Sequence, residues 1–142
     1  MESADDARID DEAIGIARAI IEDAATVAVL TGAGISTDSG IPDFRGPNGV
    51  WTRNPEAEKR STIQHYLADP QVRRDAWQVR LESDMFNAEP NAGHRALVGL
   101  EHSDRLHTLV TQNIDGLHVI AGSSPDKVVE IHGTVHRWEC VE

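Results

Sequence analysis

Helix-like hydrophobic periods alternate with short apolar runs along the chain, an order typical of an α/β fold. Asp10 or Asp11 is placed to cap a first helix. Its apolar positions are Ile14, Ala17, Ile20 or Ile21, and Ala24. The run 26–31 is nearly continuous in β-branched and apolar residues, which predicts a strand buried on both faces of a parallel sheet. A glycine turn follows, and we expect a helix to start at Ser36.

The rest of the chain predicts a loop, three more helical segments and two more strands. Residues 41–56 contain three of the six prolines and two glycines, which indicates a loop. Residues 61–86 read as a helix in two pieces broken near Pro70. Its inward candidates are Tyr66, Leu67, Val72, Trp77 and Leu81. Asn91 is placed to cap a further helix. The runs 106–111 and 127–131 predict strands.

Composition places the chain among globular proteins. Its 142 residues suit one domain or part of a larger one, and 39% of them are hydrophobic. No apolar run approaches the ~18 residues of a membrane span. Residues 1–12 contain six acids and lack the apolar core of a secretory signal. We expect a cytoplasmic protein that does not act at a membrane.

The chain is acidic: 13 basic and 24 acidic residues give a net charge of −11. This balance argues against direct nucleic-acid binding, which needs a basic surface. Arg outnumbers Lys 11 to 2, and the acids are spread along the chain, a pattern typical of adaptation to strong salt. Ordinary acidity is the alternative. Cys140 is the only cysteine, so a disulfide within the chain is impossible.

Three chemically distinctive segments follow the three predicted strands, at the edge where open α/β sheets bind ligands. The first, Gly32-Ala33-Gly34, lets the backbone approach an anion closely. Taken alone, it is a weak signal. Thr37 occupies the third glycine position of a dinucleotide fingerprint, and Glu56 is only a loose candidate for its ribose-binding acid. An ordinary dehydrogenase therefore fits poorly.

The other segments bring aromatic, charged and amide groups to the same edge. In the loop 40–46, Phe44 can shield a reacting centre while Arg45 meets a phosphate; alternatively, Phe44 fills the core and Arg45 is solvated. The turn 112–115 offers amides and a carboxylate for ribose hydroxyls or a carboxamide, or is simply a hydrogen-bonded turn. His132 ends a strand and can take a proton from a sugar hydroxyl.

The remaining histidines receive a structural interpretation. We expect His94 to pack or to form hydrogen bonds within its helix. The others are expected to be structural or exposed: His65, His102, His107, His118 and His136.

Four motifs together resemble the sirtuin family of NAD-dependent protein deacylases: GAGISTDSGIPDFRG (32–46), PNAGHRAL (90–97), TQNIDGLH (111–118) and HG (132–133). The resemblance begins after an acidic leader, 1–9. It implies that residues 10–142 are the N-terminal part of a sirtuin-type catalytic domain, with a Rossmann-like parallel sheet. Residues 46–90 would form a helical and cofactor-loop insertion, and 134–142 the incomplete start of a zinc-ribbon small domain.

The resemblance also implies the reaction and the site. Sirtuins cleave nicotinamide from NAD and transfer an acyl group from a lysine of a protein substrate to ADP-ribose. The phosphate and ribose site would contain Gly32, Ala33, Gly34 and Ser36. The flexible cofactor loop would contain Asp43, Phe44 and Arg45, and the ribose and nicotinamide pocket Gln112, Asn113, Ile114 and Asp115. Asn113 would hold a water or a ribose hydroxyl, Asp115 would accept from the carboxamide, and His132 would be the general base.

Acyl preference is partly readable from the resemblance. A sirtuin subgroup that removes succinyl or malonyl groups uses a Tyr-x-x-Arg pair to bind the acyl carboxylate. Here Trp77 replaces the tyrosine while Arg80 remains. Because the hydroxyl is missing, we favour acetyl or another uncharged acyl group. Alternatively, Trp77 is a core residue and Arg80 a surface charge.

The match stops before the family's zinc site is complete. Sirtuins hold structural zinc with four ligands, of which Cys140 supplies one and His136 at most a second. We therefore expect zinc in the full-length family member and no metal bound by this chain alone. The leading hypothesis is the N-terminal part of a deacetylase, inactive by itself. The alternatives are a non-catalytic NAD or ADP-ribose-binding fragment, a subunit completed by a second polypeptide, and a mono-ADP-ribosyltransferase.

Overall fold

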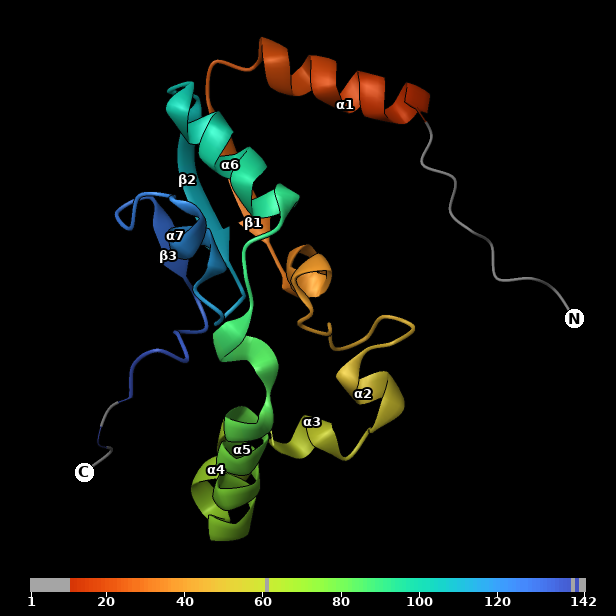
Figure 1. Ribbon diagram of the computed structural model, residues 1–142, viewed down its shortest axis with the longest axis vertical. Coiled ribbons are helices and arrows are strands. Elements are labelled where there is room, and N and C mark those ends of the chain that lie inside the picture. Colours follow the sequence, from red (N-terminus) through yellow and green to blue (C-terminus); the bar gives the residue numbers. More distant parts are fainter. Residues whose placement is uncertain (1–10, 61, 139, 141–142) are drawn as a thin grey trace, which may run out of the picture.

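The computed structural model describes residues 11–60, 62–138 and 140, and it shows an α/β fold (Figure 1). Its sheet is parallel, with the order β1-β2-β3. The strands are β1 (Val27–Thr31), β2 (Leu106–Thr111) and β3 (Val128–Glu130). The prediction of an α/β fold with three parallel strands is therefore confirmed. The acidic leader 1–9 and the cap candidate Asp10 lie outside the described residues.

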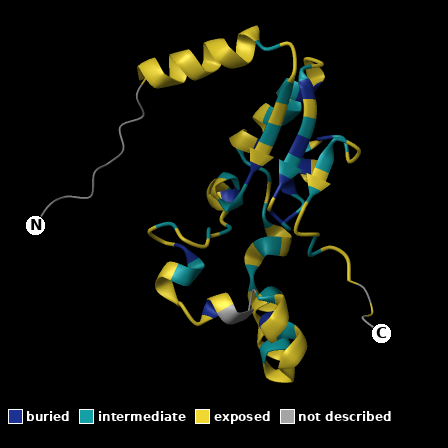
Figure 2. Cartoon of the chain, turned by 180° about the vertical axis from the view of Figure 1, so that it is seen from behind, coloured by how far each residue is buried: buried dark blue, intermediate teal, exposed yellow. Residues whose placement is uncertain are grey.

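The central strand β2 carries the core (Figure 2). Leu106 and Leu109 are 2% and 0% exposed, and Leu117 from helix α7 (Leu117–Ala121) is 1% exposed. Strand β1 alternates between half-buried and exposed residues instead, and Leu30 is 66% exposed. The expectation that β1 is buried on both faces is wrong for this chain. Helix α6 (Ala92–His102) packs on β2 and α7, and no described helix covers Leu30.

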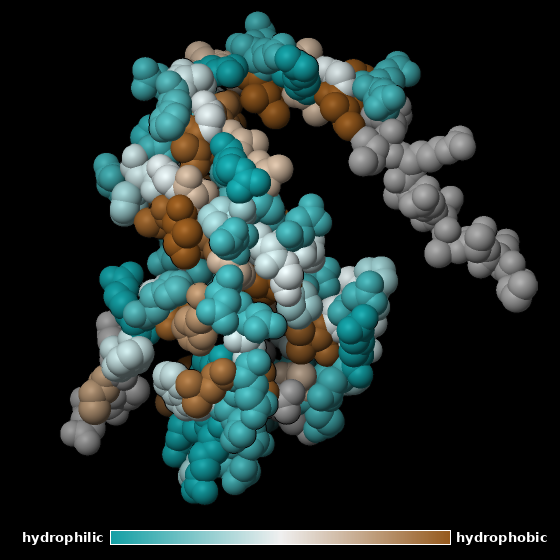
Figure 3. Space-filling model, viewed as in Figure 1, coloured by the Kyte–Doolittle hydropathy of each residue, from teal (hydrophilic) through white to brown (hydrophobic). Residues whose placement is uncertain are grey.

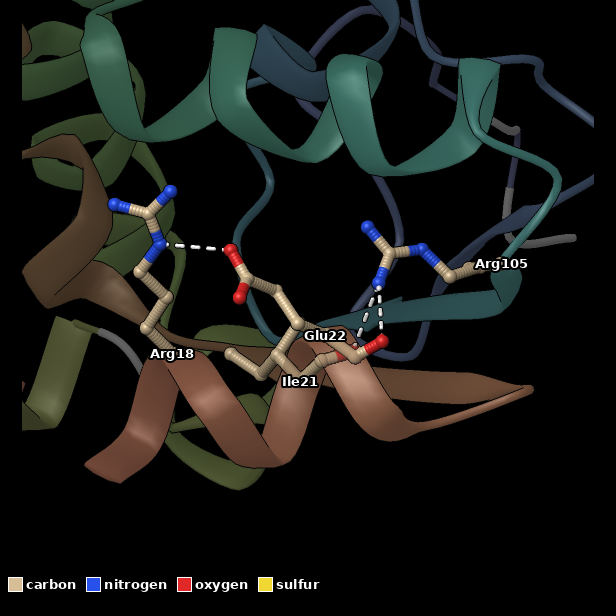
Figure 4. A network of polar contacts seen from close by, with 4 residues as sticks. All are labelled: Arg18, Ile21, Glu22 and Arg105. Carbon is tan, nitrogen blue, oxygen red and sulfur yellow. Dashed lines mark hydrogen bonds and ion pairs between the residues drawn. The ribbon is translucent and has the colours of Figure 1, made fainter. Parts of the chain in front are cut away.

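Helix α1 (Asp11–Asp23) forms as predicted, with Asp11 as its first residue, but its apolar face is open. Ile14 and Ile20 are 51% and 65% exposed, and Figure 3 shows apolar side chains on the surface of α1. Arg105, just before β2, donates to the carbonyls of Ile21 and Glu22 at 2.9 and 3.3 Å (Figure 4). A positive charge at a helix C-terminus also interacts favourably with the helix dipole. Through these bonds, Arg105 joins α1 to the sheet.

Short helices fill the segment between β1 and α6. The segment 41–56, expected to be a loop, contains the one-turn helix α2 (Val50–Arg53). The other helices are α3 (Ala57–Arg60), α4 (Ile63–Ala68), α5 (Pro70–Glu82) and the 3-10 helix η2 (Asp84–Asn87). The break near Pro70 is confirmed: Asp69 caps α5 by accepting from the Gln71 amide at 2.7 Å. The longest helices have 13 residues, and no described helix is long and apolar enough to cross a membrane.

Helices α4 and α5 bury less than their periodicity predicts. Tyr66 and Val72 are half-buried. Leu67, Trp77 and Leu81 are 55%, 42% and 78% exposed, so the expectation that these three face inward is wrong. These helices lie below the sheet rather than against it, so only α3 and α4 cover α5 extensively (Figure 1).

The cap predicted at Asn91 is confirmed and also makes a tertiary contact. Its side chain accepts from the Gly93 amide at 2.8 Å, while His94 Nδ1 accepts from the Asn91 amide at 3.3 Å. The same side chain donates to the Ile35 carbonyl at 2.7 Å and to Ser39 Oγ at 2.9 Å. Both acceptors belong to the 3-10 helix η1 (Ala33–Ser39) that follows β1. Asn91 therefore joins α6 to the turn after β1.

Because Leu109 is fully buried on the central strand, Leu109→Ala is expected to lower the free energy of unfolding by about 2–4 kcal/mol. Val129→Ala on β3, where the side chain is 47% exposed, is the matched control and should cost less than about 1 kcal/mol. Urea denaturation followed by circular dichroism measures both. Equal losses in the two variants would contradict the placement of the core.

Candidate active site at the strand ends

The segments after β1, β2 and β3 meet at one edge of the sheet, as the sequence predicted. The Gln112 amide donates to the Thr31 carbonyl at 3.0 Å, so the turn after β2 continues alongside β1. The Ile131 amide donates to the Thr111 carbonyl at 3.0 Å, which brings the following His132 to the end of β2. The carboxyl ends of parallel strands lie at the same edge of a sheet. The pairing of β1, β2 and β3 therefore brings the segments that follow them to one edge.

Ser36, Asn113 and Asp115 form a buried hydrogen-bonded cluster at this edge. Ser36 Oγ donates to Asp115 Oδ2 at 2.8 Å and accepts from Asn113 Nδ2 at 3.0 Å. Asn113 Nδ2 also donates to the Gly32 carbonyl at 3.1 Å. The three residues are 1%, 8% and 5% exposed. Buried and mutually bonded, these side chains have one defined arrangement.

The Asp115 carboxylate is held from both sides. Its second oxygen, Oδ1, accepts from the Leu117 amide at 3.0 Å. The Asp115 carbonyl accepts from His136 Nε2 at 2.9 Å. His136, expected to be structural or exposed, is exposed and also forms this structural contact. Gly116 has a φ of 73°, and a Cβ there would lie 2.9 Å from the His136 ring. A glycine is thus required for the turn and for the approach of His136.

The turn after β1 differs from the prediction. Helix η1 begins at Ala33 with the extended Gly32 as its N-cap, so the expected helix start at Ser36 is wrong. Ser36 lies inside η1, where its hydroxyl bonds to Asp115 instead of capping a helix. Gly34 is exposed, with open space where a Cβ would be. The backbone at Gly34 is therefore accessible to a ligand.

His132 is exposed, and its geometry defines which nitrogen can accept a proton. Its Nδ1 lies 2.9 Å from the Gln112 carbonyl. A carbonyl oxygen only accepts, so Nδ1 carries the proton and Nε2 carries the lone pair. The ring is thereby oriented as a base by the turn that also carries Asn113.

Phe44 and Arg45 lie on an ordered loop. The Asp43 and Phe44 carbonyls accept from the amides of Val50 and Trp51 at 2.8 and 2.9 Å. The Trp51 ring contacts Phe44, with ring centroids 4.7 Å apart, and the Arg45 guanidinium lies 4.5 Å above it. Phe44 is 43% exposed, so the alternative that it fills the core is wrong. A hollow of about 370 Å³ adjoins this loop, lined by Thr37, Gly40, Pro42, Asp43, Pro47 and Asn48.

Trp77 and Arg80 lie on α5, in the helical segment below the sheet. Trp77 Nε1 donates to the Tyr66 hydroxyl at 3.0 Å. The Arg80 guanidinium lies 5.4 Å from the Trp77 ring and 6.0 Å from the Tyr66 ring. Trp77 is exposed, so the alternative that it is a core residue is wrong. Its hydrogen-bond partner, the hydroxyl of Tyr66, comes from α4.

Comparison with known proteins decides the family. The Sir2 family model matches residues 32–142. The chain belongs to the Sir2 family. It is 54% identical to NAD-dependent protein deacetylase 2 of Streptomyces coelicolor over 80% of this chain and 47% of that protein. It is 42% identical to the NAD-dependent protein deacetylase of Chromobacterium violaceum over 87% of this chain and 50% of that protein.

Solved sirtuin structures share the fold. A structure described as "Sir2-p53 peptide-NAD+" matches with a TM-score of 0.72 and 36% identity, over 90% of this chain and 49% of that one. A second Sir2 enzyme structure matches with a TM-score of 0.75 at 36% identity, over 88% of this chain and 48% of that one. This sirtuin chain thus spans about half the length of the curated relatives it matches.

The zinc part of the sirtuin resemblance has one counterpart among the described residues. Cys140 is a free, exposed thiol. Within residues 11–60, 62–138 and 140, no three His, Cys, Asp or Glu residues are grouped so as to hold a metal. His136, the second zinc candidate, uses its Nε2 on the Asp115 carbonyl.

A second buried polar group lies behind the sirtuin site, and the sequence interpretation missed it. Thr31 Oγ1 lies 2.9 Å from Thr111 Oγ1 and 2.8 Å from His118 Nε2. The His118 ring lies 4.9 Å from the His94 ring, and both residues are at most 2% exposed. The only signal in the sequence is that both strands end in threonine. Their pairing depends on the register of β1 and β2.

The pKa of His118 is lowered to about 4, chiefly by burial and also by the neighbouring His94, while Asp115 acts in the opposite direction. Burial also lowers the pKa of His94. The folded chain therefore favours neutral rings. As the pH falls below the ordinary value of 6.5, the unfolded chain binds these protons first, so folding loses stability.

We expect the free energy of unfolding to fall by about 2 kcal/mol between about pH 7 and about pH 4.5 on account of His118. Urea denaturation at several pH values measures the slope. His118→Gln should flatten it, whereas His107→Gln, at an exposed position of β2, should leave it unchanged. Identical slopes for the wild type and both variants would refute the assignment to His118.

Proposed function

We propose that this chain is the NAD-binding part of an NAD-dependent protein-lysine deacetylase. The observation that carries the proposal is that the buried Ser36–Asn113–Asp115 cluster and the free Nε2 of His132 share one strand-end edge. The names of the relatives from Streptomyces coelicolor and Chromobacterium violaceum support the same activity.

The residues at this edge fit a dinucleotide. Ala33, Gly34 and Ser36 would lie along the phosphates and a ribose, because the backbone at Gly34 is open. The exposed Arg45 guanidinium suits a phosphate, and Phe44 beside it would shield the reacting ribose from water. The turn Gln112, Asn113, Ile114 and Asp115 would hold the ribose and nicotinamide. NAD supplies a nicotinamide–ribose bond whose cleavage makes the ribose an acceptor for the acyl group.

His132 would act as the general base. Its Nε2 would take a proton from a ribose hydroxyl. Nδ1 would keep its own proton and donate it to the Gln112 carbonyl, and this hydrogen bond stabilises the charged ring. Asn113, held through the Thr111 hydroxyl and the Gly32 carbonyl, would position a water or a ribose hydroxyl. The proton acceptor and the positioning amide thus come from neighbouring strand ends.

We further propose that the whole protein has the sirtuin plan expected from the sequence. It has a leader at 1–9, a catalytic domain from residue 10 with its helical insertion at 46–90, and a zinc-ribbon module that starts within 134–142. A C-terminal half or a second polypeptide would complete the Rossmann-like domain and supply the zinc ligands beyond Cys140. A cytoplasmic location is part of this proposal. A sirtuin structure named with p53 peptide and NAD supports an acylated-lysine protein substrate.

The deciding experiment fuses this chain to the remaining C-terminal half of the Streptomyces coelicolor relative and assays an acetyl-lysine peptide with NAD. We expect deacetylation that His132→Ala reduces at least about a hundredfold, because general-base catalysis contributes that much. His107→Ala, an exposed histidine of β2, is the control and should retain activity. A fusion that folds and binds NAD but does not deacetylate the peptide would favour the alternative of a non-catalytic NAD-binding fragment.

For the chain alone, calorimetry with NAD should show binding, and nicotinamide release should be absent. Release that depends on both peptide and His132 would show that this chain is catalytically sufficient. Transfer of label from NAD to a protein would instead favour mono-ADP-ribosylation. Failure of both the chain and the fusion to bind NAD would refute the proposed function.

We also propose acetyl or another uncharged acyl group as the substrate, because Arg80 lies against two aromatic rings and Trp77 lacks the hydroxyl of the Tyr-x-x-Arg pair. In the fusion, kcat/KM for an acetyl-lysine peptide should exceed that for a succinyl-lysine peptide by at least about tenfold. Trp77→Tyr should narrow this ratio, and Trp77→Phe is its matched control. A succinyl preference in the unaltered protein would overturn the assignment.

A further inference from the structure

A line of buried hydrogen bonds runs from α7 through both strand ends to the backbone of Asn113. Thr31 Oγ1 donates to Thr111 Oγ1 at 2.9 Å, and Thr111 Oγ1 also accepts from the Asn113 amide at 3.0 Å. Thr31 and Thr111 are 8% and 2% exposed, and each is the last residue of its strand. The hydroxyl pair therefore bridges the points where β1 and β2 leave the sheet.

The direction of these bonds defines the state of His118. Because Thr31 uses its only proton on Thr111, it accepts from His118, whose Nε2 lies 2.8 Å away. His118 Nε2 thus carries a proton. Among the described residues, no group forms a hydrogen bond with its buried Nδ1. A protonated ring would place a second, unpaired N–H donor at this buried position, so the neutral ring is the one that fits.

His94, near the N-terminus of α6, contacts His118 through its ring rather than through a hydrogen bond. Its Nδ1 accepts from the Asn91 amide, so its Nε2 carries the proton, and no group in the described part of the chain bonds to that Nε2. The ring lies against His118, with centroids 4.9 Å apart. Asp115 favours a charged form of both rings, whereas Arg95 opposes a charge on His94 and His94 opposes a charge on His118.

We propose that His118 is a positioning residue of the nucleotide site. It acts as a neutral donor that holds the Thr31–Thr111 hydroxyl pair and, through it, the Asn113 backbone. His118 itself is 2% exposed and touches no reacting atom, so it acts only through these threonines. Its importance for binding rests on the proposed function, while the positioning itself is a property of the free protein.

The first test is amide hydrogen exchange by NMR without a ligand. His118→Leu removes the donor, and the protection of the Asn113 amide should fall at least about tenfold more than that of Leu109, since local opening adds to any global loss. His118→Gln keeps a donor near the Nε2 position and should preserve Asn113 protection within about threefold. Leu106→Ala, at the far end of β2, is the control for general destabilisation. It should lower the exchange protection of the Asn113 and Leu109 amides by the same factor.

A second pair of variants, at Thr31, tests the next hydrogen bond between His118 and Asn113. Thr31→Val keeps the shape but removes the hydroxyl, and should affect Asn113 as His118→Leu does. Thr31→Ser keeps the hydroxyl and should resemble the wild type. If Asn113 loses no more protection than Leu109 in both His118→Leu and Thr31→Val, the positioning role is overturned.

The consequence for the site is read from ADP-ribose titrations by calorimetry. The folded His118→Leu variant should bind at least about tenfold more weakly than the wild type, and His118→Gln within about threefold of it. A wild-type chain and fusion that bind no nucleotide would refute the proposed function, while the exchange data would still test the positioning role. Wild-type affinity in His118→Leu would overturn the link to the site.

Discussion

The side-chain amide of Asn113 holds together the two turns on which the site depends. It donates both to the Gly32 carbonyl, at the end of β1, and to Ser36 Oγ, which in turn bonds to Asp115. Asn113, Ser36 and Asp115 are buried, so water competes little for their hydrogen bonds, and an unmade bond would leave a costly unpaired group. The parallel pairing of β1 and β2 places Asn113 where it can serve both turns.

The strand-end edge is built in two layers. The groups suited to a ligand are exposed: His132 at the strand ends, and Phe44 and Arg45 on the loop that follows η1. Each is supported by a bonded or packed neighbour: the Gln112 carbonyl orients His132, and Trp51 underlies both loop residues. Such support holds reactive groups in place before a ligand arrives, which reduces the ordering cost of binding.

Sequence patterns predicted which segments meet at the edge of the sheet better than they predicted the packing. The glycine turn, the turn at 112–115 and His132 were expected at one edge because parallel strands share their carboxyl ends, and they lie there. By contrast, Leu30 and Leu81 were expected to be buried and are exposed. Periodicity identifies an apolar face but not whether another element covers it.

By itself, the sequence determined the three strands, the Asn91 cap and the family, because these depend on local spacing, turn chemistry and long specific motifs. Only the tertiary structure decided that Ser36 bonds to Asp115 rather than capping a helix, and that His136 reaches the Asp115 carbonyl. It alone also placed Thr31 and Thr111 beside His118. These residues are separated by many positions along the chain, and their contacts depend on strand register and burial, which no local pattern encodes.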